Sequence, residues 1–176
     1  MFTIKYKVSK QRYNNFIGEM GYYQIKCNDK LYGDIYPYEL EDIMGIEYLY
    51  DWFEDLLQIA IELNERDYIA LNNIESNNIW LEFTKQQNKI LISVVKSEKK
   101  NGIGFIAYNL QEKSYVEKSL KEEKVEYKDF IMEILIKSNK YLNEVKQLNI
   151  KEGNIEQIKR SCDLIIELEK IYEKQW

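Results

Sequence analysis

The residues that could do chemistry in this chain are carboxylates, lysines, tyrosines and thiols, because the sequence contains no histidine. Histidine is the usual acid–base group near neutral pH and the commonest metal ligand. Its absence excludes Ser–His–Asp triads, Cys–His dyads and imidazole catalysis. Cys27 and Cys162 stand far apart without metal-type spacing, so we expect two small buried thiols and not a disulfide.

Two stretches come near to known catalytic motifs without completing them. Gly102-Ile-Gly104 lacks the third glycine of a dinucleotide fingerprint and the Lys-Ser/Thr of a P-loop, which favours a bulge or tight turn. Asp67, Glu82 and Lys85 suggest the acid–x–Lys pattern of metal-dependent nucleases, but the spacing is one residue too long. Glu82 and Lys85 would therefore point to opposite faces of a strand. The sequence predicts no catalytic residue, no metal site and no cofactor.

The most distinctive chemical feature is the segregation of charge. The segment Leu31–Glu65, called the acidic segment below, holds ten acidic residues and no lysine or arginine. The whole chain has a net charge of −5, so the remainder carries an excess of five positive charges. Like charges three or four residues apart on a helix repel each other by roughly 0.2–0.5 kcal/mol per pair. Asp51 has such neighbours at Glu47, Glu54 and Asp55.

Aromatic residues accompany this charge. We expect Tyr50 and Phe53 to face the core, and Tyr48 and Trp52 to lie at the edge of the apolar stripe or outside it. Exposed aromatic side chains beside carboxylates are typical of hot spots that bind a basic protein. An ordinary solvated helix face is the alternative interpretation. The predicted partner-binding residues are Glu41, Asp42, Glu47, Tyr48, Asp51, Trp52, Glu54 and Asp55.

The elements that position these residues follow from periodicity. Alternating apolar residues predict strands at 2–8, 21–27, 31–36, 68–74, 79–83, 89–95 and 105–110. A short helical stretch is predicted between Pro37 and Gly45. From Ile46 to about Asn64 apolar residues recur with helical spacing, which predicts an amphipathic helix. Two further amphipathic helices close the chain, and their short connection at Asn149–Gly153 favours an antiparallel pair.

Strands and helices are segregated along the chain, without the alternation of a parallel sheet. This order predicts an α+β fold: a mainly antiparallel sheet, one central amphipathic helix and a C-terminal antiparallel helix pair. We find no internal repeat and no linker, and we expect residues 1–176 to form a single domain. The N-terminus lacks the apolar core of a signal peptide, and no apolar run approaches the ~18 residues that span a bilayer. We therefore expect a cytoplasmic protein with no membrane partner.

A resemblance covers residues Tyr22–Val95. This stretch resembles immunity proteins of bacterial polymorphic toxin and contact-dependent growth inhibition systems. The similarity is carried by Tyr23-Gln-Ile-Lys-Cys-Asn-Asp-Lys-Leu-Tyr-Gly33, Trp52-Phe53-x-x-Leu56-Leu57, Tyr68-Ile-Ala-Leu-x-x-Ile74-Glu75, Trp80-Leu-x-Phe83 and Leu91-Ile-Ser-Val94. These are mostly core and turn residues.

The resemblance implies an antitoxin that binds the toxin domain of a cognate effector, often a nuclease, and blocks its active site. An acidic surface would complement the basic cleft of such a nuclease. Nucleic acid itself is not an expected partner, since no basic stripe is present. Two alternatives remain: a phage-type inhibitor that mimics nucleic acid with acids spaced along an extended face, and a carboxylate-dependent enzyme. A deep pocket lined by two acids with raised pKa values would favour the enzyme.

Overall fold

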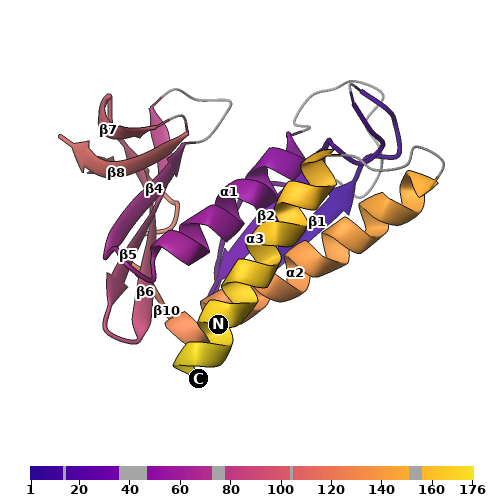
Figure 1. The fold of residues 1–176 in the computed structure, drawn as a ribbon. Helices are drawn as coiled ribbons and strands as arrows, with labels where there is room; N and C mark the ends of the chain where they lie inside the picture. Colours follow the sequence, from indigo (N-terminus) through magenta and orange to yellow (C-terminus); the bar gives the residue numbers. More distant parts are fainter. Residues whose placement is uncertain (14, 36–46, 73–77, 104, 151–155) are drawn as a thin grey trace.

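The computed structural model describes the chain except residues 14, 36–46, 73–77, 104 and 151–155 (Figure 1). Its described strands form two antiparallel sheets. The three helices pack against one another, and two of them contact the smaller sheet. The α+β class predicted from the sequence is confirmed, as are the antiparallel pairing, the central amphipathic helix and the C-terminal helix pair. The helical stretch predicted between Pro37 and Gly45 lies outside the described residues.

The smaller sheet is formed by the N-terminal strands in the order β1-β2-β3. Their bounds are Phe2–Val8 for β1, Gly21–Cys27 for β2 and Lys30–Tyr32 for β3. The turn between β2 and β3 begins at Asn28, whose φ of 56° is a left-handed conformation that asparagine tolerates better than most residues. The strand predicted at 31–36 is shorter than expected, because β3 ends at Tyr32.

The larger sheet has the strand order β10-β6-β5-β4-β8-β7, and the short strand β9 pairs with β6. The bounds are Tyr68–Asn72 (β4), Ile79–Gln86 (β5), Lys89–Lys96 (β6), Lys99–Ile103 (β7), Ile106–Gln111 (β8), Ser114–Tyr115 (β9) and Glu123–Glu126 (β10). Strands β7, β9 and β10 were not predicted. Among the described residues β7 forms an edge of the sheet and pairs with β8, and its register shifts between Asn101 and Gly102. This shift agrees with the bulge or tight turn that the glycines favoured.

The helices are α1 (Leu49–Glu62), α2 (Tyr127–Leu148) and α3 (Glu156–Gln175). Helices α1 and α3 run in the same direction, with their N-terminal turns adjacent (Figure 1). Helix α2 runs against α3: Lys146 Nζ near its end lies 3.2 Å from Cys162 Sγ, and the ring of Tyr127 at its start lies 5.6 Å from that of Trp176. None of the described helices is long and apolar enough to cross a membrane.

One large cluster of buried side chains joins the two sheets through the helices. The ring of Phe130 on α2 lies 5.1 Å from that of Phe2 in the smaller sheet and 5.5 Å from that of Phe83 in the larger sheet. Cys27 is buried in this cluster as expected, whereas Cys162 is half-buried; neither forms a disulfide. Helix α1 is thus packed between β-structure and the two C-terminal helices, a position that determines which of its residues reach the surface.

Candidate functional site

Backbone hydrogen bonds to the start of β2 and to the loop before it hold the N-terminal end of α1 in place. The backbone of Glu47 pairs with that of Gly21 at the start of β2, with N···O distances of 2.8 and 3.0 Å. Gly21 has no room for a side chain here, because a Cβ would lie 2.3 Å from the carbonyl oxygen of Lys7. The N–H of Tyr50 donates to the backbone carbonyl of Glu19 at 3.1 Å. The first turn of α1 therefore stands beside Glu19.

Helix α3 contacts the same turn from the other side. The Tyr50 hydroxyl hydrogen-bonds with the Glu54 carboxylate and lies 2.7 Å from the backbone carbonyl oxygen of Gln157. Arg160 on α3 places Nη2 2.9 Å from Glu54 Oε1. These contacts join two helices whose residues are 107 positions apart in the chain. Glu54 is thus paired within the fold.

Four carboxylates gather at this end of α1, and we call them the acidic cluster: Glu19, Asp51, Glu54 and Asp55. Glu19 is buried and accepts hydrogen bonds from the backbone N–H and side-chain amide of Asn15, at 3.0 and 2.9 Å. Neither Asp51 nor Asp55 forms an ion pair with a described residue. Arg160 is the nearby cation, and it is engaged with Glu54.

The surroundings of Asp51 and Asp55 raise the pKa of both carboxyl groups and so disfavour their ionised forms. Burial first, and then the charges of Asp51 and Glu54, raise the pKa of Asp55 to about 7, against the opposing effect of Arg160. Partial burial, and then the charges of Glu54 and Glu19, also raise the pKa of Asp51. Ionising these groups therefore costs free energy in the isolated protein, and an external cation would recover part of that cost.

This free-energy cost predicts a stability change that depends on pH. A carboxyl group with a folded-state pKa near 7 and an unfolded value near 3.8 binds more protons in the folded state, so stability falls as pH rises between these values. Asp55→Asn should remove that loss. We expect the variant to match the parent near pH 4 and to exceed its stability at pH 8 by on the order of 1–2 kcal/mol, after allowance for solvent screening.

The measurement is urea unfolding of both proteins at intervals from pH 4 to pH 8. Asp163→Asn is the matched control, since it removes an exposed carboxylate on α3 outside the acidic cluster and should unfold as the parent does at each pH. A difference between Asp55→Asn and the parent that does not change with pH would contradict the raised pKa of Asp55.

The predicted partner-binding residues differ in how far the structure exposes them to solvent. Asp51 and Tyr48 are exposed, Tyr48 by 38%, and Glu47, Glu54 and Asp55 are half-buried. Tyr50 and Phe53 face the core as expected. Glu41 and Asp42 lie outside the described residues.

The expectation that Trp52 lies at the edge of the apolar stripe or outside it is wrong. Its side chain is 4% exposed, and its ring stacks on that of Tyr23 in β2, with centroids 3.9 Å apart. The reason is that α1 packs against a sheet and two helices, so its buried arc is wider than a single stripe. Trp52 cannot contact a partner without unfolding of the core.

Near the C-terminal end of α1 the fold neutralises one acidic residue, Glu62. Glu62 accepts from Arg66 Nε at 3.2 Å, from the Tyr108 hydroxyl at 3.3 Å and from Gln58 Nε2 at 3.1 Å. The two ends of α1 therefore differ. At its start, Asp51 and Asp55 have no ion-pair partner among the described residues, whereas Glu62 near its end is paired with Arg66.

The near-nuclease pattern does not form a site. Glu82 is buried on one face of β5, where it accepts from Tyr68 Oη at 3.0 Å and from Lys113 Nζ at 2.7 Å. Lys85 lies on the opposite face, with Nζ 2.8 Å from the carbonyl oxygen of Leu63 and 4.6 Å from the ring centroid of Tyr127. The prediction that Glu82 and Lys85 diverge is confirmed. Within the described part of the chain, no three His, Cys, Asp or Glu side chains are placed to hold a metal ion.

Sequence reasoning grouped Asp51, Glu54 and Asp55 correctly but missed two members of their surroundings. Glu19 comes from the loop before β2, and Arg160 comes from α3. Neither residue has a local signal in the sequence, because both approach α1 only through tertiary packing.

Comparison of the chain with models of known protein families, with curated proteins and with solved structures finds no match.

Proposed function

We propose that this protein is an immunity protein, a binding protein that neutralises a basic toxin domain by covering its active site. The observation that carries the proposal is the acidic cluster at the start of α1. It brings Glu19, Asp51, Glu54 and Asp55 together around a single nearby arginine, and the pKa values of the two unpaired aspartates are raised. Such a cluster lowers the stability of the isolated protein and gains most from a cationic partner.

A nuclease is the favoured target class. Enzymes that grip phosphate backbones present lysine and arginine side chains in a cleft, and these side chains are complementary to clustered carboxylates. Long-range attraction between the two surfaces speeds their encounter and disfavours acidic partners. Exposed Tyr48 lies beside the cluster and would add apolar contact at its margin.

The acidic cluster differs from what a nucleic-acid mimic needs. Asp51 and Asp55 are one helical turn apart, a rise of about 6 Å along the axis, and Glu62 farther along α1 is already bound to Arg66. A mimic would instead repeat unpaired acids over an extended surface. The cluster is compact and suits a few basic side chains of a protein.

A carboxylate-dependent enzyme is the second candidate, because two neighbouring acids with raised pKa values are one half of its signature. The other half is a pocket around them. Three pockets in the described part of the chain are lined by other residues: one lies between α2 and α3, one at the ends of β6 and β8, and one beside the C-terminal ends of α1 and α3. Turnover of a nuclease, glycosidase or phosphatase substrate that is lost in Asp55→Asn would favour this candidate over the binding protein.

The test of the proposal is protection of cells. The candidate toxin is sought in the gene immediately upstream. Its C-terminal domain is expressed from an inducible promoter, together with this protein or with an Asp51→Lys, Asp55→Lys variant. We expect the parent to restore growth and to abolish the toxin's activity in a purified mixture, and the variant to fail at equal expression. Asp163→Lys with Glu167→Lys, at two exposed positions four residues apart on α3, changes the net charge by the same amount and is the matched control. Protection that both variants retain would contradict the acidic cluster as the binding site.

A further inference from the structure

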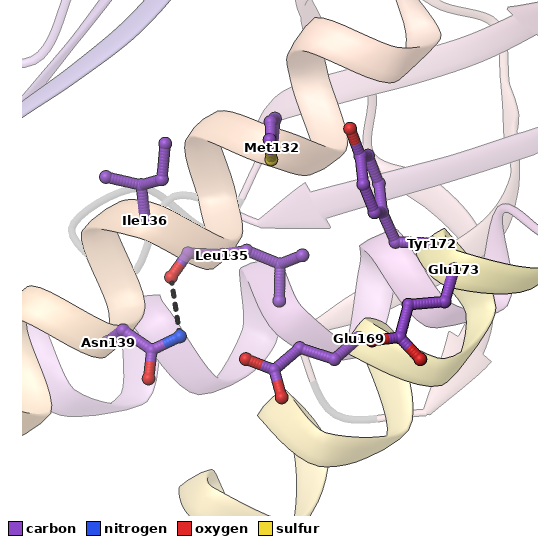
Figure 2. A pocket seen from close by; sticks show the side chains of 7 residues that line it. All are labelled: Met132, Leu135, Ile136, Asn139, Glu169, Tyr172 and Glu173. Atoms are coloured by element: carbon purple, nitrogen blue, oxygen red, sulfur yellow. Dashed lines mark hydrogen bonds between the residues drawn. The ribbon is translucent and has the colours of Figure 1, made fainter. Parts of the chain in front are cut away.

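A second surface with the character of a binding site lies between α2 and α3, away from the acidic cluster. Its lining residues, which we call the α2–α3 groove, are Met132, Leu135, Ile136, Asn139, Glu169, Tyr172 and Glu173 (Figure 2). The groove encloses about 380 Å³, enough for one or two inserted side chains. Glu169 lies nine residues beyond Arg160 on α3, about 13 Å along the helix axis. The two surfaces are therefore distinct.

On the α2 side the groove is apolar: Leu135 is buried at its floor, and two neighbouring side chains are accessible to solvent. Met132 is 39% exposed and Ile136 is 53% exposed, and they stand one turn apart on α2. The core-facing stripe of α2 is already buried against the sheets, so these residues form a second apolar face that the fold does not need. Exposed apolar groups gathered in this way mark interaction surfaces.

The opposite wall is acidic. The carboxylates of Glu169 and Glu173 extend from α3 beside Leu135 (Figure 2). Neither forms an ion pair with any residue that the structure describes. The amide of Asn139 does not reach them, since it donates to the carbonyl oxygen of Leu135 at 3.2 Å. Two like charges one turn apart, with an apolar floor beside them, complement an apolar side chain flanked by cations.

This arrangement disfavours a second copy of the chain as the occupant. A symmetric contact would place the same patch on both subunits, so the carboxylates of Glu169 and Glu173 from both copies would gather in one interface. A basic helix has the opposite charge. Two antiparallel helices with an exposed groove between them can receive a third helix, whose side chains enter at positions three and four apart.

We propose that the α2–α3 groove binds a basic amphipathic helix of a partner protein. One or two leucine-like side chains would enter between Met132, Leu135 and Ile136, where the flexible thioether of Met132 can adapt to their shape. Lysine or arginine residues one turn away would pair with Glu169 and Glu173. The proposal is independent of toxin neutralisation, because it uses a different face and no residue of the acidic cluster.

The experiment uses a synthetic 14-residue amphipathic helix of leucine and lysine, together with a leucine and glutamate helix of the same pattern. Methyl NMR spectra of the full-length protein, labelled at methionine and isoleucine, are recorded during titration with each peptide. We expect the leucine–lysine peptide to shift the Met132 and Ile136 signals with saturation, and the leucine–glutamate peptide to leave them in place.

Variants separate the groove from general attraction to an acidic protein. Glu169→Gln with Glu173→Gln should weaken binding of the leucine–lysine peptide roughly tenfold, and Ile136→Asp should abolish it. Glu156→Gln with Asp163→Asn removes two carboxylates elsewhere on α3 and should leave it unchanged. The proposal is overturned if Met132 and Ile136 do not shift, if both peptides shift them equally, or if the control pair weakens binding as much. Shifts that follow the protein's own concentration without peptide would show a second copy in the groove and would also overturn it.

Discussion

Trp52→Ala is expected to lower the free energy of unfolding by about 3–5 kcal/mol, the usual cost of truncating a large buried aromatic residue. Trp52 is 4% exposed, stacks on Tyr23 at 3.9 Å and meets the edge of Phe53 at 5.1 Å. Loss of the ring leaves a cavity between α1 and the smaller sheet. In a chain of this size the melting temperature should fall by roughly 10 °C. Thermal unfolding followed by circular dichroism measures the change.

Trp52→Phe is the matched control. The Nε1–H of Trp52 is buried and has no hydrogen-bond partner among the described residues, so its removal gives up no bond with them and relieves an unsatisfied donor. A phenyl ring can keep most of the stacking on Tyr23. We expect less than half the loss of stability seen with alanine. An alanine variant that melts with the parent would contradict the burial of Trp52 and restore it as a candidate surface anchor.

Trp52 also shows where periodicity stops being informative. The spacing of apolar residues fixed the helix between Ile46 and Asn64 to within three residues of α1, since it begins at Leu49 and ends at Glu62. A single apolar stripe describes a helix that packs on one surface. Helix α1 packs on β2, α2 and α3 together, so Trp52 is buried along with the stripe. The width of a buried arc depends on neighbours that periodicity does not identify.

The acidic cluster was also predictable only in part: its members on α1 could be predicted from the sequence, and its neighbours from other elements could not. Helical spacing places Asp51, Glu54 and Asp55 on neighbouring positions whatever the tertiary structure. Glu19 and Arg160 join them because Tyr50 connects the N-terminus of α1 to the loop before β2 and to Gln157 on α3. The strand β7 was missed for a related reason, since an edge strand that pairs only with β8 needs no alternating apolar pattern. Contacts within one element were predictable, and contacts between distant elements were not.

The last prediction concerns how the acidic cluster binds. In binding kinetics with the toxin domain, the double variant Asp51→Asn, Asp55→Asn should associate more slowly and lose part of its salt dependence, with an affinity about 10–100-fold weaker. The reason is that these two carboxylates lack an ion-pair partner among the described residues and are available to a basic surface. Glu62→Gln on the same helix is the control and should bind as the parent does, because Glu62 is already bound to Arg66.

The pH dependence of that affinity tests the mechanism more directly. The pKa of Asp55 is raised to about 7, so at pH 6 most molecules carry a proton on this group. A cationic partner binds the ionised form, and binding below pH 7 must therefore release that proton. Affinity should rise about tenfold from pH 6 to pH 8 if the single group dominates, and Asp55→Asn should be flat across the same range. A parent protein that binds equally at both pH values, or a variant that keeps the full dependence, would show that Asp55 stays protonated or remote in the complex and that another surface carries the interaction.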